Sequence, residues 1–243
     1  MIKVTSLDMN NPVVTRGNIF GSKCQTIVNT VNCVGVMGAG IALECRLRYP
    51  AMYAKYAQIC EARLLGVGSL WLYRGADRWI LNFPTKKNWK NPSKEEYLHA
   101  GLKKFLETYE EKGITSVAFP LLGAQHGGID ARRSEEIMTS YLSNCRIPVE
   151  IYHYDPQARD DLYMKLKANL LRMTAEEIKA RTGLRSDCVK AVVEALNNPS
   201  IAQVGRLATI KGVGPTTLEK LFSFASNSDQ QSPSTTYQPW LEL

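Results

Sequence analysis

Hydrophobic residues in the first two thirds of the chain form short β-type runs separated by longer segments with helical spacing. The runs predict strands at Ile2–Leu7, Thr15–Ile19, Thr26–Val31, Val67–Tyr73, Trp79–Phe83, Ser116–Pro120 and Val149–Tyr154. The segments between them predict helices at Gly40–Tyr49, Ala51–Ala62, Lys94–Lys112 and Arg132–Asn144, the third with Ser93 as its cap. Strands interleaved with helices are typical of a mostly parallel sheet covered on both faces. We therefore expect an α/β domain over residues 1–155.

The strand pattern stops after Tyr154, where Asp155 and Pro156 end the last predicted strand. A small all-α domain is expected over residues 156–225. Its helices are predicted at Arg159–Arg172, at Ala175–Arg181 behind Thr174, at Asp187–Asn197 behind Ser186, and in a short turn behind Ser200. Residues 226–243 are rich in Ser, Gln, Thr and Pro and are predicted to be disordered.

Composition narrows the classes of partner. The 243 residues carry 30 Lys and Arg against 23 Asp and Glu, and the formal charge of +7 favours polyanionic partners. Six cysteines without a C-x-x-C spacing and only three histidines argue against a metal site. The chain has neither a signal-peptide pattern nor an apolar run near ~18 residues, so we expect a cytoplasmic protein with reduced thiols and no membrane partner.

The strongest chemical signal is the segment NTVNCVGVMGAGIA at residues 29–42. Asn29 and Asn32 stand at the end of a predicted strand, and three glycines follow before a predicted helix. Glycines let backbone N–H groups approach a ligand closely, and a helix N-terminus favours a phosphate. The segment has neither the G-x-x-x-x-G-K-[ST] pattern of NTP-binding loops nor the G-x-G-x-x-G pattern of dinucleotide-binding loops. We therefore expect a nucleotide diphosphate other than a simple NTP or NAD. A plain strand-to-helix turn is the alternative.

Four blocks of sequence together resemble the ADP-ribose-binding macrodomains. They are VTRGNIF at 14–20, the glycine segment at 29–43, ILNFPTKKNW at 80–89 and FPLLGAQHGGID at 119–130. Within that superfamily they most resemble the DarG branch, antitoxins that remove ADP-ribose from DNA. The resemblance implies a three-layer α/β/α macrodomain with a mostly parallel mixed sheet, and no cofactor.

The same resemblance implies a set of site residues. Lys86 takes the place of the family's catalytic lysine, and Asn32, the second residue expected to be catalytic, points toward the distal ribose. Lys86 could act as an acid, a base or a nucleophile, and the sequence leaves this open. Asp130 is implied as a helix cap, with a catalytic role as the alternative. The ADP-ribose contacts implied are Asn18, Ile19, Asn32, Met37, Gly38, Ala39, Gly40, Ile41, Thr85, Gly123, Ala124, Gln125, His126 and Gly127. Gln125, His126 and Ala131 depart from the DarG pattern.

A second resemblance lies in the helical region, where LATIKGVGPTTLEKL at 207–221 is similar to a helix-hairpin-helix motif. Gly212 and Gly214 would expose N–H groups to a DNA phosphate, with Lys211 and Lys220 nearby. Residues 156–225 carry 11 Lys and Arg against 7 Asp and Glu. Lys87, beside Lys86, is a further expected nucleic-acid contact. A helical bundle in which Gly-Val-Gly is only a turn is the alternative.

These resemblances imply an ADP-ribosyl glycohydrolase acting on modified nucleic-acid bases. Two other hypotheses remain, a non-catalytic module that binds ADP-ribose or ADP-ribosylated DNA, and an ADP-ribose-1″-phosphate phosphatase. The implied partners are ADP-ribose, ADP-ribosylated DNA and a cognate DNA ADP-ribosyltransferase toxin.

Overall fold

The computed structural model describes residues 11–227, so the predicted strand Ile2–Leu7 and residues 228–243 of the predicted tail lie outside it. One six-stranded sheet organises the first part of the chain, with strand order β1-β6-β5-β2-β4-β3. The strands are β1 (Val13–Gly17), β2 (Thr26–Val31), β3 (Trp71–Arg74), β4 (Trp79–Pro84), β5 (Val117–Pro120) and β6 (Val149–Tyr154). β1, β6, β5, β2 and β4 are mutually parallel, and β3 pairs antiparallel with β4 at one edge. The mostly parallel mixed sheet is therefore confirmed.

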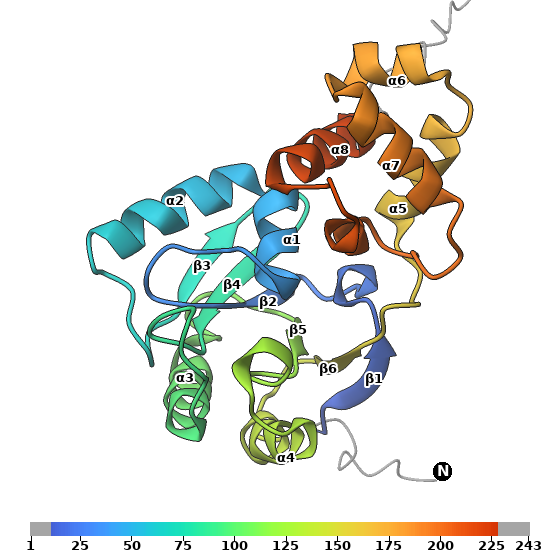
Figure 1. The fold of residues 1–243 in the computed structure, drawn as a ribbon. Helices are drawn as coiled ribbons and strands as arrows, with labels where there is room; N and C mark the ends of the chain where they lie inside the picture. Colours follow the sequence, from blue (N-terminus) through green and yellow to red (C-terminus); the bar gives the residue numbers. More distant parts are fainter. Residues whose placement is uncertain (1–10, 228–243) are drawn as a thin grey trace, which may run out of the picture.

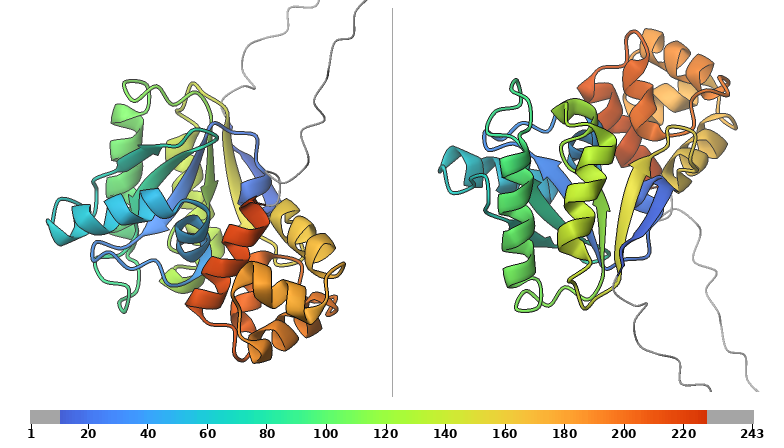
Figure 2. Two further views of the ribbon diagram at one scale, coloured as in Figure 1. Left: turned by 90° about the horizontal axis from the view of Figure 1, so that it is seen from above. Right: turned by 90° about the horizontal axis from the view of Figure 1, so that it is seen from below.

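Two pairs of helices cover the two faces of this sheet (Figures 1 and 2). Alternate strand residues point to opposite faces. Ile27 and Ile80 therefore pack with α1 and α2, while Val28 and Leu81 pack with α3 and α4. The three-layer fold is confirmed. The helices are α1 (Gly40–Arg48), α2 (Pro50–Glu61), α3 (Glu95–Thr108), α4 (Ala131–Leu142), α5 (Asp161–Leu170), α6 (Ala175–Thr182), α7 (Ser186–Leu196) and α8 (Pro215–Asn227), with 3-10 turns η1 (Ile19–Gly21), η2 (Gln125–Gly127) and η3 (Val204–Thr209).

Several predicted element boundaries are wrong. β1 ends at Gly17 because the Asn18 side chain accepts a hydrogen bond from the Phe20 N–H and turns the chain into η1. Ser93 does not cap α3, which begins after Lys94; Ser93 is instead buried. Ser186 is the first residue of α7, after Arg185. Thr174 does cap α6, in a capping box with Glu177, as predicted.

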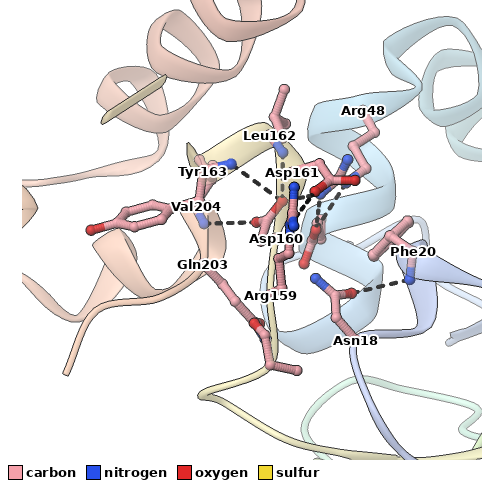
Figure 3. Close-up of polar contacts among 12 residues, drawn as sticks. Asn18, Phe20, Arg48, Arg159, Asp160, Asp161, Leu162, Tyr163, Gln203 and Val204 are labelled. Carbon is pink, nitrogen blue, oxygen red and sulfur yellow. Dashed lines mark hydrogen bonds and ion pairs between the residues drawn. The ribbon is translucent and has the colours of Figure 1, made fainter. Parts of the chain in front are cut away.

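The helices α5 to α8 form a hydrophobic cluster of their own, set to one end of the sheet (Figure 2). This cluster also takes in Leu43 and Leu47 from α1. Polar contacts strengthen the attachment (Figure 3): Arg48 donates to Glu44 at 2.6 Å and to Asp160 at 3.3 Å. Burial raises the pKa of the Glu44 carboxyl, and the nearby Arg48 guanidinium opposes that rise. The helical region is therefore joined to the sheet through α1.

Candidate functional site

The carboxyl ends of the five parallel strands meet along one edge of the sheet, which is where open α/β sheets bind ligands. In spatial order they lead into Asn18 after β1, Tyr154 in β6, the loop 121–128 after β5, Asn32 after β2 and Thr85–Lys86 after β4. At ~4.8 Å per strand, four spacings extend about 19 Å. The sequence-predicted residues are thus arranged in a row long enough for an extended dinucleotide-like ligand.

An open groove lies at the β1–β6 end of this row. Its volume is about 750 Å³, and its lining is Arg16, Leu121, Ala124, Gln125, Gly128, Ile129, Asp130, Ala131, His153 and Tyr154. The η2 loop forms one wall: Gly127 and Gly128 both donate to the Ala124 carbonyl, at 2.9 Å each. Gly123 has a φ of +65° and closes this loop by accepting from Ile129. The second predicted glycine segment is therefore a structured loop beside a groove.

Asn32 shapes the first glycine segment rather than standing free. Its side-chain oxygen accepts from the N–H groups of Val34 at 3.0 Å and Val36 at 3.3 Å. Its amide nitrogen donates to the Val36 carbonyl, and Tyr56 donates to the Asn32 carbonyl at 2.7 Å. Asn32 thus holds the loop that presents the exposed residues 38–40 at the start of α1.

Two residues in this segment lie deeper than the sequence suggests. Asn29 is fully buried within β2, where its side chain donates to Asn82 on β4 at 2.9 Å. β2 has the predicted bounds Thr26–Val31, so Asn29 lies inside the strand and only Asn32 follows its end. Met37 is also fully buried, and its sulfur lies 3.9 Å from the Asn29 amide. Both side chains support the loop from below.

Lys86 lies where three loops meet. Its Nζ donates to the His126 carbonyl at 2.6 Å and lies 3.5 Å from the Trp89 carbonyl oxygen. A Cβ added at Gly40 would lie 3.1 Å from the His126 ring, so the two glycine segments contact each other beside Lys86. Thr85, almost fully buried, donates its N–H to Val31 at 2.9 Å and fixes the start of the lysine loop. The structure therefore brings Lys86 together with both glycine segments.

The remaining predicted residues have simpler surroundings. Asn18 and Ile19 are largely buried at the η1 turn, and Ile41 is half-buried in the first turn of α1. Asp130 caps α4 by accepting from the Arg133 N–H at 3.0 Å, in agreement with the predicted cap. Within residues 11–227, no group of three or more His, Cys, Asp or Glu side chains could hold a metal ion.

The predicted hairpin in the helical region is partly as expected. Lys211, Gly212 and Gly214 are exposed, and Gly212 adopts a φ of +90° before α8. Lys220 is different, because its Nζ donates to the Gly183 carbonyl within the helical region. No helix among the described residues has the length and apolar character needed to cross a membrane.

The sequence did not indicate that Trp89 lies beside Lys86, or that Arg48 pairs with Asp160. Trp89 lies within the recognised block at 80–89, and its exposure could not be read from that pattern. Arg48 and Asp160 are 112 positions apart, and no local pattern connects them. Asp160 is nevertheless the N-cap of α5, which a helix-start signal could have indicated.

Comparison with known proteins gives consistent matches. The Macro domain family matches residues 28–138. A DNA ADP-ribosyl glycohydrolase of Thermus aquaticus is 36% identical over 172 residues, covering 68% of this chain and 48% of that protein. A DNA ADP-ribosyl transferase–DNA ADP-ribosyl glycohydrolase fusion protein of Thermosipho africanus is 33% identical, covering 58% of this chain and 42% of that protein. The chain thus spans about half the length or less of these relatives. The solved macrodomain of Thermus aquaticus DarG is 37% identical with a TM-score of 0.54, and the match covers 59% of this chain and 97% of that structure.

Proposed function

The chain belongs to the macrodomain family, and on that basis we propose that it is an ADP-ribosyl glycohydrolase that removes ADP-ribose from modified DNA bases. The position of Lys86, at the junction of the two glycine segments and the β4 loop, is the observation that carries this proposal. The similarity of this chain to DNA ADP-ribosyl glycohydrolases supports the choice of substrate. Its six free cysteines fit a cytoplasmic protein.

The row of loops suggests how ADP-ribose would lie. The adenosine would occupy the end near Asn18 and Tyr154, beside the groove. The diphosphate would accept hydrogen bonds from backbone N–H groups of segments 123–127 and 38–40, because such groups bind anions where they are exposed at a helix start. The distal ribose would then reach Lys86, at the β4 end of the row.

Hydrolysis breaks the bond between C1″ and the base nitrogen, whose electron pair leaves with the base. Water adds its oxygen to C1″ and gives up one proton, which restores the group that has protonated the departing base. We propose that Lys86 is that group and acts as an ammonium, because its Nζ already lies against two carbonyl oxygens, the usual partners of a donor. General acid catalysis of this kind contributes ~10²–10⁴-fold in rate.

The test is release of ADP-ribose from ADP-ribosylated thymidine and guanosine oligonucleotides by wild type, Lys86→Ala and Lys103→Ala. We expect Lys86→Ala to lose ~10²-fold or more in turnover, while calorimetry gives an ADP-ribose affinity within several-fold of wild type. Lys103→Ala, at an exposed lysine on α3 outside the site, is the matched control and should keep kcat. Turnover by Lys86→Ala at the wild-type rate would contradict the lysine mechanism. Binding of ADP-ribose without release by the wild type would favour a binding module.

We also propose that Lys211, Gly212 and Gly214 contact a DNA phosphate, which is supported by their exposure at the start of α8. Lys220 is left out of this contact because it pairs with Gly183. Lys211→Gln should lower DNA affinity equally for all sequences and reduce the slope of log affinity against log salt by about 1. Lys190→Gln, an exposed lysine on α7, is the control. An unchanged slope in Lys211→Gln would argue against this contact.

A cognate DNA ADP-ribosyltransferase is the protein partner we propose. The support is the Thermosipho africanus relative, which is named as a fusion of transferase and glycohydrolase. Co-purification of the full chain with that transferase would test it, and separate elution at micromolar concentrations would count against it.

A further inference from the structure

Tyr154 is the last residue of β6 and lines the groove at the β1–β6 end of the row. It is 43% exposed, yet its hydroxyl is engaged, because it donates to the Gln203 side-chain oxygen at 3.0 Å. Burial raises the pKa of this hydroxyl, so it stays protonated at neutral pH and acts as a donor. Since Gln203 is 1% exposed, the exposed area of Tyr154 belongs mainly to its ring. The groove therefore has an aromatic ring beside it whose polar end is already satisfied.

Gln203 comes from the helical region, 49 positions after Tyr154, and immediately precedes η3. Its side-chain nitrogen donates to the Asp155 carbonyl at 2.8 Å and to the Ala158 carbonyl at 3.1 Å. Both N–H groups of the amide are therefore used by the segment that leaves β6. These bonds fix the orientation of the amide, and the amide oxygen in turn fixes the hydroxyl end of Tyr154.

The η1 turn, which begins after Asn18, is supported from the same region. The Arg48 guanidinium lies 4.3 Å from the centre of the Phe20 ring in η1, which is a cation–π arrangement. Arg48 is itself held by Asp160, the N-cap of α5, at 3.3 Å. Figure 3 shows η1, α1 and the helical region meeting at this polar network. Tyr154 and η1, the two elements assigned to the adenosine end, are therefore both positioned by contacts with the helical region.

An aromatic ring held in one orientation is a favourable partner for a planar base. A side chain that is free to rotate must be ordered when the ligand binds, and this ordering weakens the affinity. The bond from Gln203 has already ordered the Tyr154 ring in the protein without ligand. Gln203 can therefore raise the affinity for a base without touching it. Its effect should be confined to binding, because Lys86 follows β4, at the other end of the row.

We propose that the helical region forms part of the ADP-ribose site, with Gln203 as a positioning residue that holds the Tyr154 ring against the adenine. This inference rests on the proposed function, which supplies the direction of ADP-ribose along the row. It gives the helical region a role in ligand binding that is separate from the proposed contact of its hairpin with DNA.

Calorimetry with ADP-ribose and the full chain gives the first test. Tyr154→Phe is the central variant, because it keeps the ring and removes only the hydroxyl that Gln203 holds. Since the freed ring must be ordered again on binding, we expect its affinity to fall about fivefold. Tyr141→Phe is the matched control, because the Tyr141 hydroxyl bonds His99 at 3.0 Å between α3 and α4, and its affinity should stay within about twofold. Equal affinity of wild type and Tyr154→Phe would overturn the proposal.

A pair of backgrounds tests whether Gln203 acts through Tyr154. In the wild-type chain, Gln203→Met should weaken ADP-ribose binding about fivefold. In Tyr154→Ala, which has no ring to position, the same substitution should change the affinity by less than about twofold. An equal loss in both backgrounds would show a general structural role and overturn the positioning role. If urea titration shows that Gln203→Met is unfolded, the comparison of wild type with Tyr154→Phe decides the proposal.

The two halves of the ligand locate the effect. AMP carries the adenosine end of ADP-ribose and ribose 5-phosphate carries the other end, and NMR titrations can measure weak binding of each. Because a base stacked on an aromatic ring gains about tenfold in affinity, Tyr154→Ala should weaken AMP binding by this factor and leave ribose 5-phosphate within about twofold. Equal losses for the two ligands would overturn the assignment of Tyr154 to the adenosine end.

Kinetics separate this inference from the proposed function. On ADP-ribosylated oligonucleotides, Tyr154→Phe should raise KM about fivefold and keep kcat within about twofold, as expected when only uniform binding is lost. A fall in kcat with an unchanged KM would overturn the positioning role. If the wild type releases no ADP-ribose while AMP binding still depends on Tyr154, the glycohydrolase assignment fails and the adenosine site stands. If the wild type binds neither AMP nor ADP-ribose, both are overturned.

Discussion

Asp160→Asn offers a sharp test of how the helical region is attached. The Asp160 side chain is 1% exposed. One of its oxygens accepts from the Leu162 N–H at 3.0 Å and lies 3.3 Å from the Arg48 guanidinium. The other oxygen accepts from the Val204 N–H at 3.0 Å. The substitution keeps the shape of the side chain but turns the second oxygen into an N–H donor that faces another donor.

The expected loss of stability can be worked from these contacts. A hydrogen bond to a charged group contributes ~1.5–3 kcal/mol, and the Val204 N–H would lose one while remaining buried. Arg48 would lose one of its two carboxylate partners but keep Glu44, so the further cost is below the ~3–5 kcal/mol seen when a buried charge is left alone. If the side-chain amide of the Asp160→Asn variant were flipped, its nitrogen would face the Arg48 guanidinium instead of the Val204 N–H, and one donor would still face another donor. We expect the free energy of unfolding to fall by about 3 kcal/mol.

The assay is urea unfolding of the full chain, together with amide hydrogen exchange in α5 and η3. With an m-value of ~2 kcal/mol/M, a loss of this size lowers the midpoint by ~1.5 M. Asp161→Asn is the matched control, because its neighbouring carboxylate is 76% exposed and its ion pair with Arg159 is a surface one. The control should lose less than ~0.5 kcal/mol. Equal midpoints for the two variants would refute the role assigned to Asp160.

Three further predictions follow from single positions. Gly101→Ala places a Cβ 2.2 Å from the Phe83 ring, so the free energy of unfolding should fall by ~1–3 kcal/mol in urea titrations, and Phe83→Leu in the same chain should recover part of it. Gly40→Ala strains a φ of +55° and crowds His126; we expect calorimetry to show ADP-ribose affinity reduced ~10-fold, and unchanged affinity would exclude this segment from the site. Burial raises the pKa of Cys145 to about 11 from 9.0, so iodoacetamide at pH 8 should label it far more slowly in native than in unfolded protein. Because the folded-state pKa is the higher one, its contribution to stability is complete below pH 9 and is lost as the pH rises toward 11, and Cys145→Ala should remove that part of the alkaline decline.

The regular parts of the fold could be predicted because they depend on local patterns. Ile27 and Val28, like Ile80 and Leu81, are adjacent apolar residues that go to opposite faces of the sheet, and such runs are typical of strands buried on both sides. Thr174 caps α6 because its partner Glu177 is only three residues away. Element starts set by distant contacts were missed, as at Ser93, where packing against Gly127 takes the place of a cap.

The site residues likewise divide into those that local sequence patterns located and those whose surroundings depend on distant contacts. Lys86 and the glycine segments could be located because each lies in a contiguous block of sequence. The engagement of Asn32 within its own loop, and the burial of Asn29 and Met37, depend on how that loop folds over β2. The partner of Lys220 is Gly183, 37 positions earlier, so the loss of this lysine from the hairpin surface could not be read from the sequence.

The outward face of α1 has a consequence for how this chain can be divided. Leu43 and Leu47 lie against the helical cluster, and the Arg48 guanidinium has one of its two carboxylate partners there. A fragment ending at Tyr154 would expose the apolar side chains of Leu43 and Leu47 to water and would leave Arg48 with Glu44 as its remaining carboxylate partner of the two. Such fragments should self-associate at concentrations where the whole chain stays monodisperse. We therefore expect the macrodomain part of this chain to need the helical region for solubility. Expressing it alone or fused to another protein would require polar substitutions at Leu43 and Leu47 of α1.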